Sequence, residues 1–194
     1  MPDVTWAGRN VDSVIAGKVD ASADANGLPR NVLRAEVLEE SGGNPYIEGD
    51  AGASIGLHQL HAAGQGKGMS IAQRRDPDQN LAVGTPYIAA AWKAHAHLSG
   101  RDRVFWTMTK SGHPGDIDRI GPGYERDQAV RNITRIVDTW ERLEREQPTV
   151  AAGTTVAGLP AERVQGALDD AQAWVRAHPV AAAAIAGGAA LLLL

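Results

Sequence analysis

The residues whose types and spacing suit chemistry lie between positions 40 and 60 of this 194-residue chain. Glu40 closes an apolar stretch with helical spacing, and a glycine-rich segment with Gln59 among apolar residues follows it. A carboxyl group half-buried at the carboxyl end of a helix is disfavoured in its charged form, because desolvation and the helix dipole both oppose the charge. Such a group suits proton donation to a leaving-group oxygen, and glycines let backbone approach a ligand closely. Taken alone, a glutamate at a helix end is more often a solvated residue, so this pattern leaves both interpretations open.

The same segment resembles the soluble lytic transglycosylase (SLT) family, which is related to goose-type lysozymes. Glu40-Ser41 is similar to the Glu-Ser pair that ends a helix in this family. Residues 52–60 (GASIGLHQL) resemble its Gly-Leu-x-Gln stretch, with His58 at a position where the family often has Met. Residues 76–81 (DPDQNL) resemble the Asp-Pro-x-x-Asn start of its next helix. The resemblance covers about residues 8–146 and implies a mainly α, lysozyme-like fold.

One loop departs from the family pattern. The family usually has an Ala-Tyr-Asn-Ala-Gly stretch along its sugar site, whereas residues 108–115 read MTKSGHPG. The glycine is kept and the Tyr-Asn pair is not, so we expect Ser111 or His113 to contact the sugar instead. Tyr124 either lines the site or is a packing residue. The full set of predicted substrate-binding residues is Ser41, Ser54, Gln59, Ser111, His113 and Tyr124.

The resemblance implies a lytic transglycosylase that cleaves the β-1,4 bond between N-acetylmuramic acid (MurNAc) and N-acetylglucosamine (GlcNAc) in peptidoglycan. Glu40 is the predicted catalytic residue. It first protonates the glycosidic oxygen and then takes the proton of the muramoyl C6 hydroxyl, which closes a 1,6-anhydro ring. The 2-acetamido group takes the place of a second carboxylate, as in substrate-assisted hydrolases. Glu36 and Glu39 have no role in this prediction, and Glu39, about 100° around the helix from Glu40, is expected to be solvated.

Two other functions stay open at this point. The first is a phage endolysin that hydrolyses the same bond as a muramidase, which needs a group that positions water. Candidates for that group are Asp50, Asp76, Asp116 and Asp118. The second is a non-catalytic, lysozyme-like virion protein that binds glycan or has a structural role, as the altered 109–115 loop would allow.

The spacing of apolar residues predicts a mainly α chain. A first helix begins near Val11 and stops at Gly27, and a second begins at Pro29 and ends near Ser41. Strict alternation of apolar and polar residues, which is typical of strands, is not found in the sequence. The remaining expectations are a loop over 42–56, a short helical turn over 56–61, a helix from Asp76 to about His97, a loop-rich stretch over 110–123, and a helix carrying the stripe Val130, Ile133, Val137 and Trp140.

Composition narrows the class of protein. The chain has no cysteine, which excludes a disulfide scaffold, a thiolate zinc site and a cysteine nucleophile. It has 19 Lys and Arg against 23 Asp and Glu, so it lacks the basic excess of nucleic-acid-binding proteins. The histidine pairs 58/61 and 95/97 do not have the spacing of a zinc-binding HExxH motif. We therefore expect no metal, no cofactor and no nucleic-acid partner.

Composition also divides the chain into four segments. We predict a lysozyme-like domain over 1–146, a linker over 147–159, an amphipathic helix over 160–178 and an apolar tail over 179–194. From residue 180 to residue 194 no side chain is polar. As a helix this run would be about 22 Å long, short of the roughly 30 Å hydrocarbon core of a bilayer. The tail therefore either inserts into a membrane or packs against protein.

The first residues, MPDVTW, do not have the basic and apolar regions of a secretory signal peptide. A cell-wall enzyme without such a signal is expected in a bacteriophage, where it travels with the virion and opens the bacterial cell wall for genome delivery. The expected partners are peptidoglycan glycan strands and, through the tail, a virion or host membrane or other virion proteins.

Overall fold

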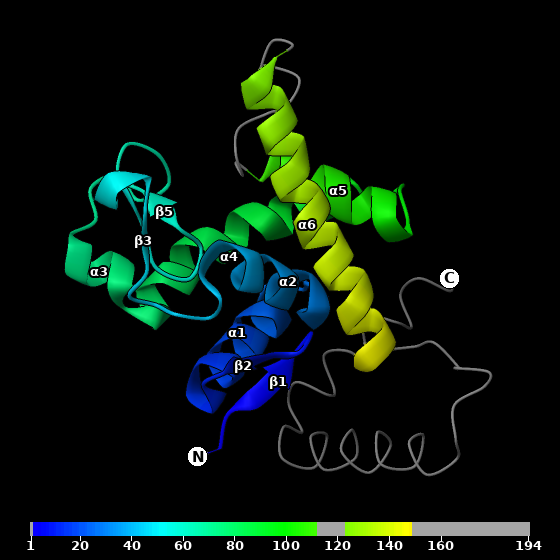
Figure 1. The fold of residues 1–194 in the computed structure, drawn as a ribbon, viewed down its shortest axis with the longest axis horizontal. Coiled ribbons are helices and arrows are strands. Elements are labelled where there is room, and N and C mark those ends of the chain that lie inside the picture. Colours follow the sequence, from blue (N-terminus) through cyan, green and yellow to red (C-terminus); the bar gives the residue numbers. More distant parts are fainter. Residues whose placement is uncertain (1, 112–122, 149–194) are drawn as a thin grey trace, which may run out of the picture. The chain divides into compact units, whose positions relative to one another are not determined.

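The computed structural model describes residues 2–111 and 123–148 (Figure 1). Most of the described residues are helical, so the prediction of a mainly α chain is confirmed. The helices are α1 (Ser13–Ala25), α2 (Arg30–Ser41), α3 (Ile71–Arg75), α4 (Pro77–Ala94), α5 (Gly100–Lys110) and α6 (Tyr124–Glu146). None of these helices combines the length and the apolar character that a membrane span requires. The predicted helix over 160–178 and the tail over 179–194 lie outside the described residues.

The ends of the first two helices follow the signals in the sequence. The Asp12 carboxylate caps α1 by accepting hydrogen bonds from two backbone N–H groups of its first turn. Gly27, beyond the carboxyl end of α1, has a positive φ of 67°, as a helix stop of this kind requires. α2 follows Pro29 and ends at Ser41, and Gly42 closes it in the left-handed conformation with its N–H bonded to the Leu38 carbonyl. Both predicted helices are confirmed.

A β-hairpin precedes α1, and the sequence analysis did not predict it. Strands β1 (Val4–Trp6) and β2 (Arg9–Val11) pair antiparallel. The two turn residues, Ala7 and Gly8, both have positive φ, as a type I′ turn requires. Val11, read as the start of a helical stripe, ends a strand instead. The turn was missed because Ala-Gly is a weaker signal for this turn than Asn-Gly or Asp-Gly.

A second small sheet corrects the interpretation of residues 42–61. Strands β3 (Glu48–Gly49), β4 (Ser54–Ile55) and β5 (Leu60–His61) pair antiparallel in the order β3-β4-β5. The predicted loop over 42–56 therefore contains two strands, and the predicted helical turn over 56–61 is wrong. Strands of two residues are too short to display the alternation by which strands are recognised.

Helices α4 and α6 were predicted, whereas α3 and α5 were not. α4 covers most of the expected range, and Asp76 caps it by accepting a hydrogen bond from the Gln79 N–H at 2.9 Å. α5 packs on α6 through an ion-pair cluster, in which the Arg101 guanidinium lies 2.8 Å from Asp138 and 2.9 Å from Glu141.

The core is built around α2, which has buried residues on all its faces. α1 packs on α2, and α6 crosses it (Figure 1). The buried side chains that α6 contributes are Ala129, Ile133, Ile136, Val137 and Leu143. Contacts with other helices therefore position α2 independently of the loops around its carboxyl end.

Candidate active site

Glu40 lies in the last turn of α2 and is half-buried. The next residue, Ser41, is buried, and its hydroxyl donates to the Val37 carbonyl at 2.9 Å. The Ser41 oxygen also accepts a hydrogen bond from the Gly43 N–H at 3.3 Å. Ser41 thus joins the last turn of α2 to the loop that leaves it. Ser41 was predicted to bind substrate, and in the structure its hydroxyl group bonds to two backbone groups.

The three-stranded sheet follows this loop; the predicted residue Ser54 is in β4, and Gln59 is in the turn between β4 and β5. The Ser54 hydroxyl donates to the Asp50 carboxylate at 2.6 Å. The Gln59 side-chain amide donates to the carbonyls of Ile47 and Gly56, at 3.2 and 3.0 Å. Both side chains therefore hold the sheet in shape, and Gln59 does so from a strained backbone with a φ of 47°.

Asn80, at the start of α4, fixes the turn between β4 and β5. Its side-chain amide donates to the carbonyls of Ile55 and Arg74, at 3.1 and 2.7 Å, and its oxygen accepts from the His58 N–H at 2.9 Å. Gly56 packs so closely here that a Cβ atom on it would lie 2.2 Å from the Arg74 carbonyl oxygen. The two segments that carry the family resemblance, 52–60 and 76–81, are therefore in contact, because the Asn80 side chain of the second binds the backbone of the first.

A buried pair, which the sequence analysis missed, joins α2 to the same turn. The His58 ring nitrogen Nδ1 lies 2.9 Å from both carboxylate oxygens of Glu36, and neither side chain is exposed. Nε2 of His58 lies 3.1 Å from the Thr85 hydroxyl, which also accepts from Ser22 at 2.9 Å. Glu36 is one helical turn before Glu40, so the pair ties this face of α2 to the sheet. The sequence signal that could have indicated this pair is His58 itself, which is at a position where the family often has the apolar residue Met.

Glu39 corrects the expectation of a solvated side chain, because only 9% of it is exposed. Its Oε1 atom accepts hydrogen bonds from Arg9 Nη2 at 2.6 Å and from the Thr139 hydroxyl at 2.7 Å. The Nε atom of Arg135 lies 3.6 Å from Glu39 Oε2. The partners come from β2 and from α6, which are far from Glu39 in the sequence.

The remaining predicted residues lie toward the altered loop. Ser111 is buried, its hydroxyl donates to the Met108 carbonyl at 3.1 Å, and its own carbonyl accepts from the Gln65 amide at 2.8 Å. His113 lies outside the described residues, as do Asp116 and Asp118. Tyr124 is the first residue of α6, and the described structure does not extend to its side chain. The alternative base Asp76 caps α4, and Asp50 accepts the bond from Ser54.

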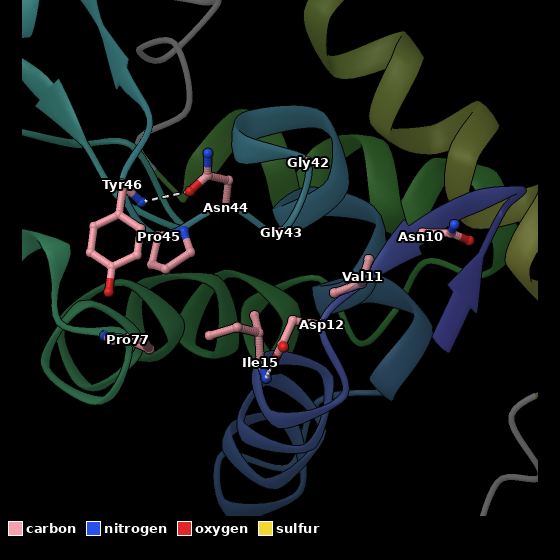
Figure 2. A pocket seen from close by; sticks show the side chains of 10 residues that line it. All are labelled: Asn10, Val11, Asp12, Ile15, Gly42, Gly43, Asn44, Pro45, Tyr46 and Pro77. Carbon is pink, nitrogen blue, oxygen red and sulfur yellow. Dashed lines mark hydrogen bonds between the residues drawn. The ribbon is translucent and has the colours of Figure 1, made fainter. Parts of the chain in front are cut away.

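An open groove of about 480 Å³ lies beside the carboxyl end of α2 (Figure 2). One wall is the loop Gly42–Tyr46, in which the Tyr46 N–H donates to the Asn44 side chain at 2.9 Å. The opposite wall is the junction between β2 and α1, with Val11, Asp12 and Ile15. Tyr46 itself is 68% exposed. The loop that follows Glu40 therefore borders a concave surface. Within the described residues no three potential metal-binding side chains gather in one place.

Comparison with known proteins places this geometry in context. Residues 18–99 match the family model described as the transglycosylase SLT domain. The chain is also similar to an endo-type membrane-bound lytic murein transglycosylase A of Citrobacter koseri, with 29% identity over 91 residues. That alignment covers 42% of this chain and 43% of the relative, so the chain spans less than half the length of the curated relative it matches.

The matched segment contains α2, the three-stranded sheet and α4, and hence Glu40, Ser41, Ser54 and Gln59. It is shorter than the expected range of 8–146, and Ser111, His113 and Tyr124 fall beyond it. Its mainly helical structure, the Glu-Ser pair at a helix end and the two sequence matches together support the SLT, lysozyme-like family for this chain.

Proposed function

We propose that the protein is a peptidoglycan lytic transglycosylase with Glu40 as its single catalytic carboxyl group. The observation that carries the proposal is the position of Glu40: it is half-buried in the last turn of α2, inside the segment that matches the SLT domain. A carboxyl group that is partly removed from water and held on a packed helix is suited to give a proton to a leaving oxygen and to take one back.

The proposed reaction needs no water molecule. Glu40 protonates the oxygen of the MurNAc–GlcNAc β-1,4 bond, and the bond between that oxygen and C1 of MurNAc breaks. The Glu40 carboxylate then takes the proton of the C6 hydroxyl, whose oxygen bonds to C1 and closes the 1,6-anhydro ring. The acetamido group of MurNAc stabilises C1 between the two steps, as in substrate-assisted enzymes.

The residues around Glu40 position it and the substrate. Ser41 fixes the turn that follows α2, and Ser54 and Gln59 stabilise the sheet that comes next in the chain. We propose that the glycan strand contacts this sheet and that Ser111, His113 and Tyr124 also bind the sugar. Hydrolysis by a muramidase is the alternative outcome for the same acid, and the products distinguish the two.

The test digests purified peptidoglycan with the full chain and with Glu40→Gln, and identifies the products by mass spectrometry. We expect muropeptides lighter by one water than hydrolytic products, and a rate at least about 100-fold lower for Glu40→Gln. Glu146→Gln is the matched control, because Glu146 also lies at the carboxyl end of a helix and should leave the rate unchanged. Reducing ends would establish the muramidase reaction. Failure of the wild type to release fragments would favour a glycan-binding or structural protein.

We also propose that the enzyme acts within a bacteriophage particle, where it opens the cell wall during genome delivery. The apolar run from residue 180 to residue 194 supports this setting, since it can fix the enzyme to a membrane or a virion protein while the domain reaches its polymeric substrate. Mass spectrometry of purified particles should detect the protein. Its presence only as free enzyme late in infection would favour an endolysin.

A further inference from the structure

The carboxylate of Glu39 joins three elements at the residue next to the proposed acid. Arg9 approaches it from β2, and Thr139 and Arg135 approach it from α6. The β1–β2 hairpin and α6 both lie outside residues 18–99, which match the SLT domain. Segments on either side of the matched domain therefore meet at one carboxylate in its central helix.

Arg9 also binds the backbone of α2. While Nη2 contacts Glu39, Nη1 donates to the Leu38 carbonyl at 2.9 Å. The same carbonyl accepts the Gly42 N–H at 3.0 Å, the bond that closes the helix. Carbonyl groups in the last turn of a helix lack partners within the helix, and an arginine side chain is suited to bind them. Arg9 thus holds both the side chain before Glu40 and the backbone turn that contains it.

The hairpin that presents Arg9 is itself fixed. Trp6 is 2% exposed, and the Arg34 guanidinium lies 5.2 Å from the centre of its ring. The Gln147 side chain donates to the Thr5 carbonyl at 2.9 Å, which ties the hairpin to the end of α6. The Arg9 guanidinium is planar, donates from two nitrogens and is carried by a fixed hairpin. It therefore constrains both the distance and the orientation between the hairpin and the last turn of α2.

We propose that Arg9 and Glu39 are positioning residues, through which the hairpin and α6 set the orientation of the last turn of α2 and of the Glu40 carboxyl group. This inference rests on the proposed function of Glu40. It implies that the working enzyme extends beyond the matched SLT segment on both sides. Small displacements of a catalytic group reduce rates steeply, by up to about 100-fold for an error near 1 Å.

The first measurement is kcat and KM on solubilised peptidoglycan strands for the full-length wild type, Arg9→Gln, Arg9→Lys and Glu39→Gln. We expect kcat to fall about tenfold or more in Arg9→Gln and Glu39→Gln, with KM changed less than about twofold, because the substrate contacts remain. Arg9→Lys restores charge but not the two-donor geometry, so it should recover only part of kcat. Arg101→Gln is the matched control, since the Arg101 side chain has the same 47% exposure as Arg9 and binds two carboxylates away from α2.

The second measurement does not depend on activity. Hydrogen exchange of the Gly42 amide reports the bond that closes α2, and we expect it to accelerate at least about fivefold in Arg9→Gln and not in Arg101→Gln. A wild-type kcat in Arg9→Gln, or an equal loss in Arg101→Gln, overturns the inference while leaving the role of Glu40 intact. A wild type without activity overturns the proposed function, and unchanged Gly42 exchange then overturns the coupling as well. Should Arg9→Gln lose its helical circular dichroism, Arg9→Lys supplies both measurements.

Discussion

At the scale of single residues, the contact between Glu36 and His58 has a high electrostatic cost, because both side chains are fully buried. Removing ionisable groups from water costs several kcal/mol per ion, and only good geometry and further hydrogen bonds offset this. Here both oxygens of Glu36 approach the same ring nitrogen, and Thr85 binds the other. The pair therefore fixes the register of α2 against the sheet, and replacing one member leaves the other buried without this partner.

We expect the single substitutions Glu36→Leu and His58→Met each to lower the free energy of unfolding by about 3–5 kcal/mol. The double substitution should lose much less, because two apolar side chains of similar volume fill the space and Thr85 keeps Ser22 as a partner. Urea unfolding of the four proteins gives the coupling energy directly. Losses that simply add would contradict this account of the pair.

Sequence reasoning could propose residues that belong to a short local motif, and it missed residues whose partners are far away in the sequence. Glu40, Ser41 and Gln59 stand in a short motif, so their positions could be predicted. Glu39 is bonded to Thr139, which is 100 residues away, and His58 to Glu36, which is 22 residues away. No local spacing encodes such contacts, so a solvated Glu39 was the natural but wrong expectation.

At the scale of elements, helices α1, α2, α4 and α6 could be predicted because they repeat apolar residues over several turns. The strands could not, because the three-stranded sheet consists of two-residue strands held by Gln59, Arg74 and Asn80 rather than by their own pattern. Arg74 donates to the carbonyls of Ala53 and Leu60, so a side chain of α3 closes this sheet from outside. The irregular elements of the site are thus stabilised by side chains from regular ones.

Gly84 in α4 tests how closely the helix and the turn pack. A Cβ atom there would lie 2.2 Å from the His58 ring, which cannot move because it is buried and bonded at both nitrogens. Overpacking of about 1–3 kcal/mol should outweigh the gain of about 1 kcal/mol in helix propensity, so Gly84→Ala should lower the free energy of unfolding.

Gly17→Ala in α1 is the control for this comparison, because nothing lies within 4 Å of its added Cβ atom. Only the gain in helix propensity acts in this variant, so Gly17→Ala should raise the melting temperature. Thermal unfolding followed by circular dichroism checks both variants. A Gly84→Ala protein as stable as wild type would show that the packing around the His58 ring can adjust to the added Cβ atom.

At the scale of the whole molecule, the described residues form a domain larger than the matched SLT segment. The hairpin and α6 lie outside that segment, yet Trp6 and the buried residues of α6 belong to the same core as α2. Helix α6 was predictable from its apolar stripe, but its contact with α2 was not, because a stripe indicates that a face is buried and not what covers it. The resemblance therefore supplied the candidate site, whereas the contacts that support that site could be read only from the fold.

The bond between Gln147 and Thr5 spans 142 positions in the chain, and it has a consequence for the order of events during synthesis. At translation speeds of about 5–20 residues per second, the hairpin leaves the ribosome on the order of ten seconds before α6 exists. Through that interval Trp6 and Arg9 have only part of their partners, and the last turn of α2 has only part of its support. The hairpin is made well before α6 and reaches its final contacts only with it, so the structure near Glu40 is complete only when α6 has been translated.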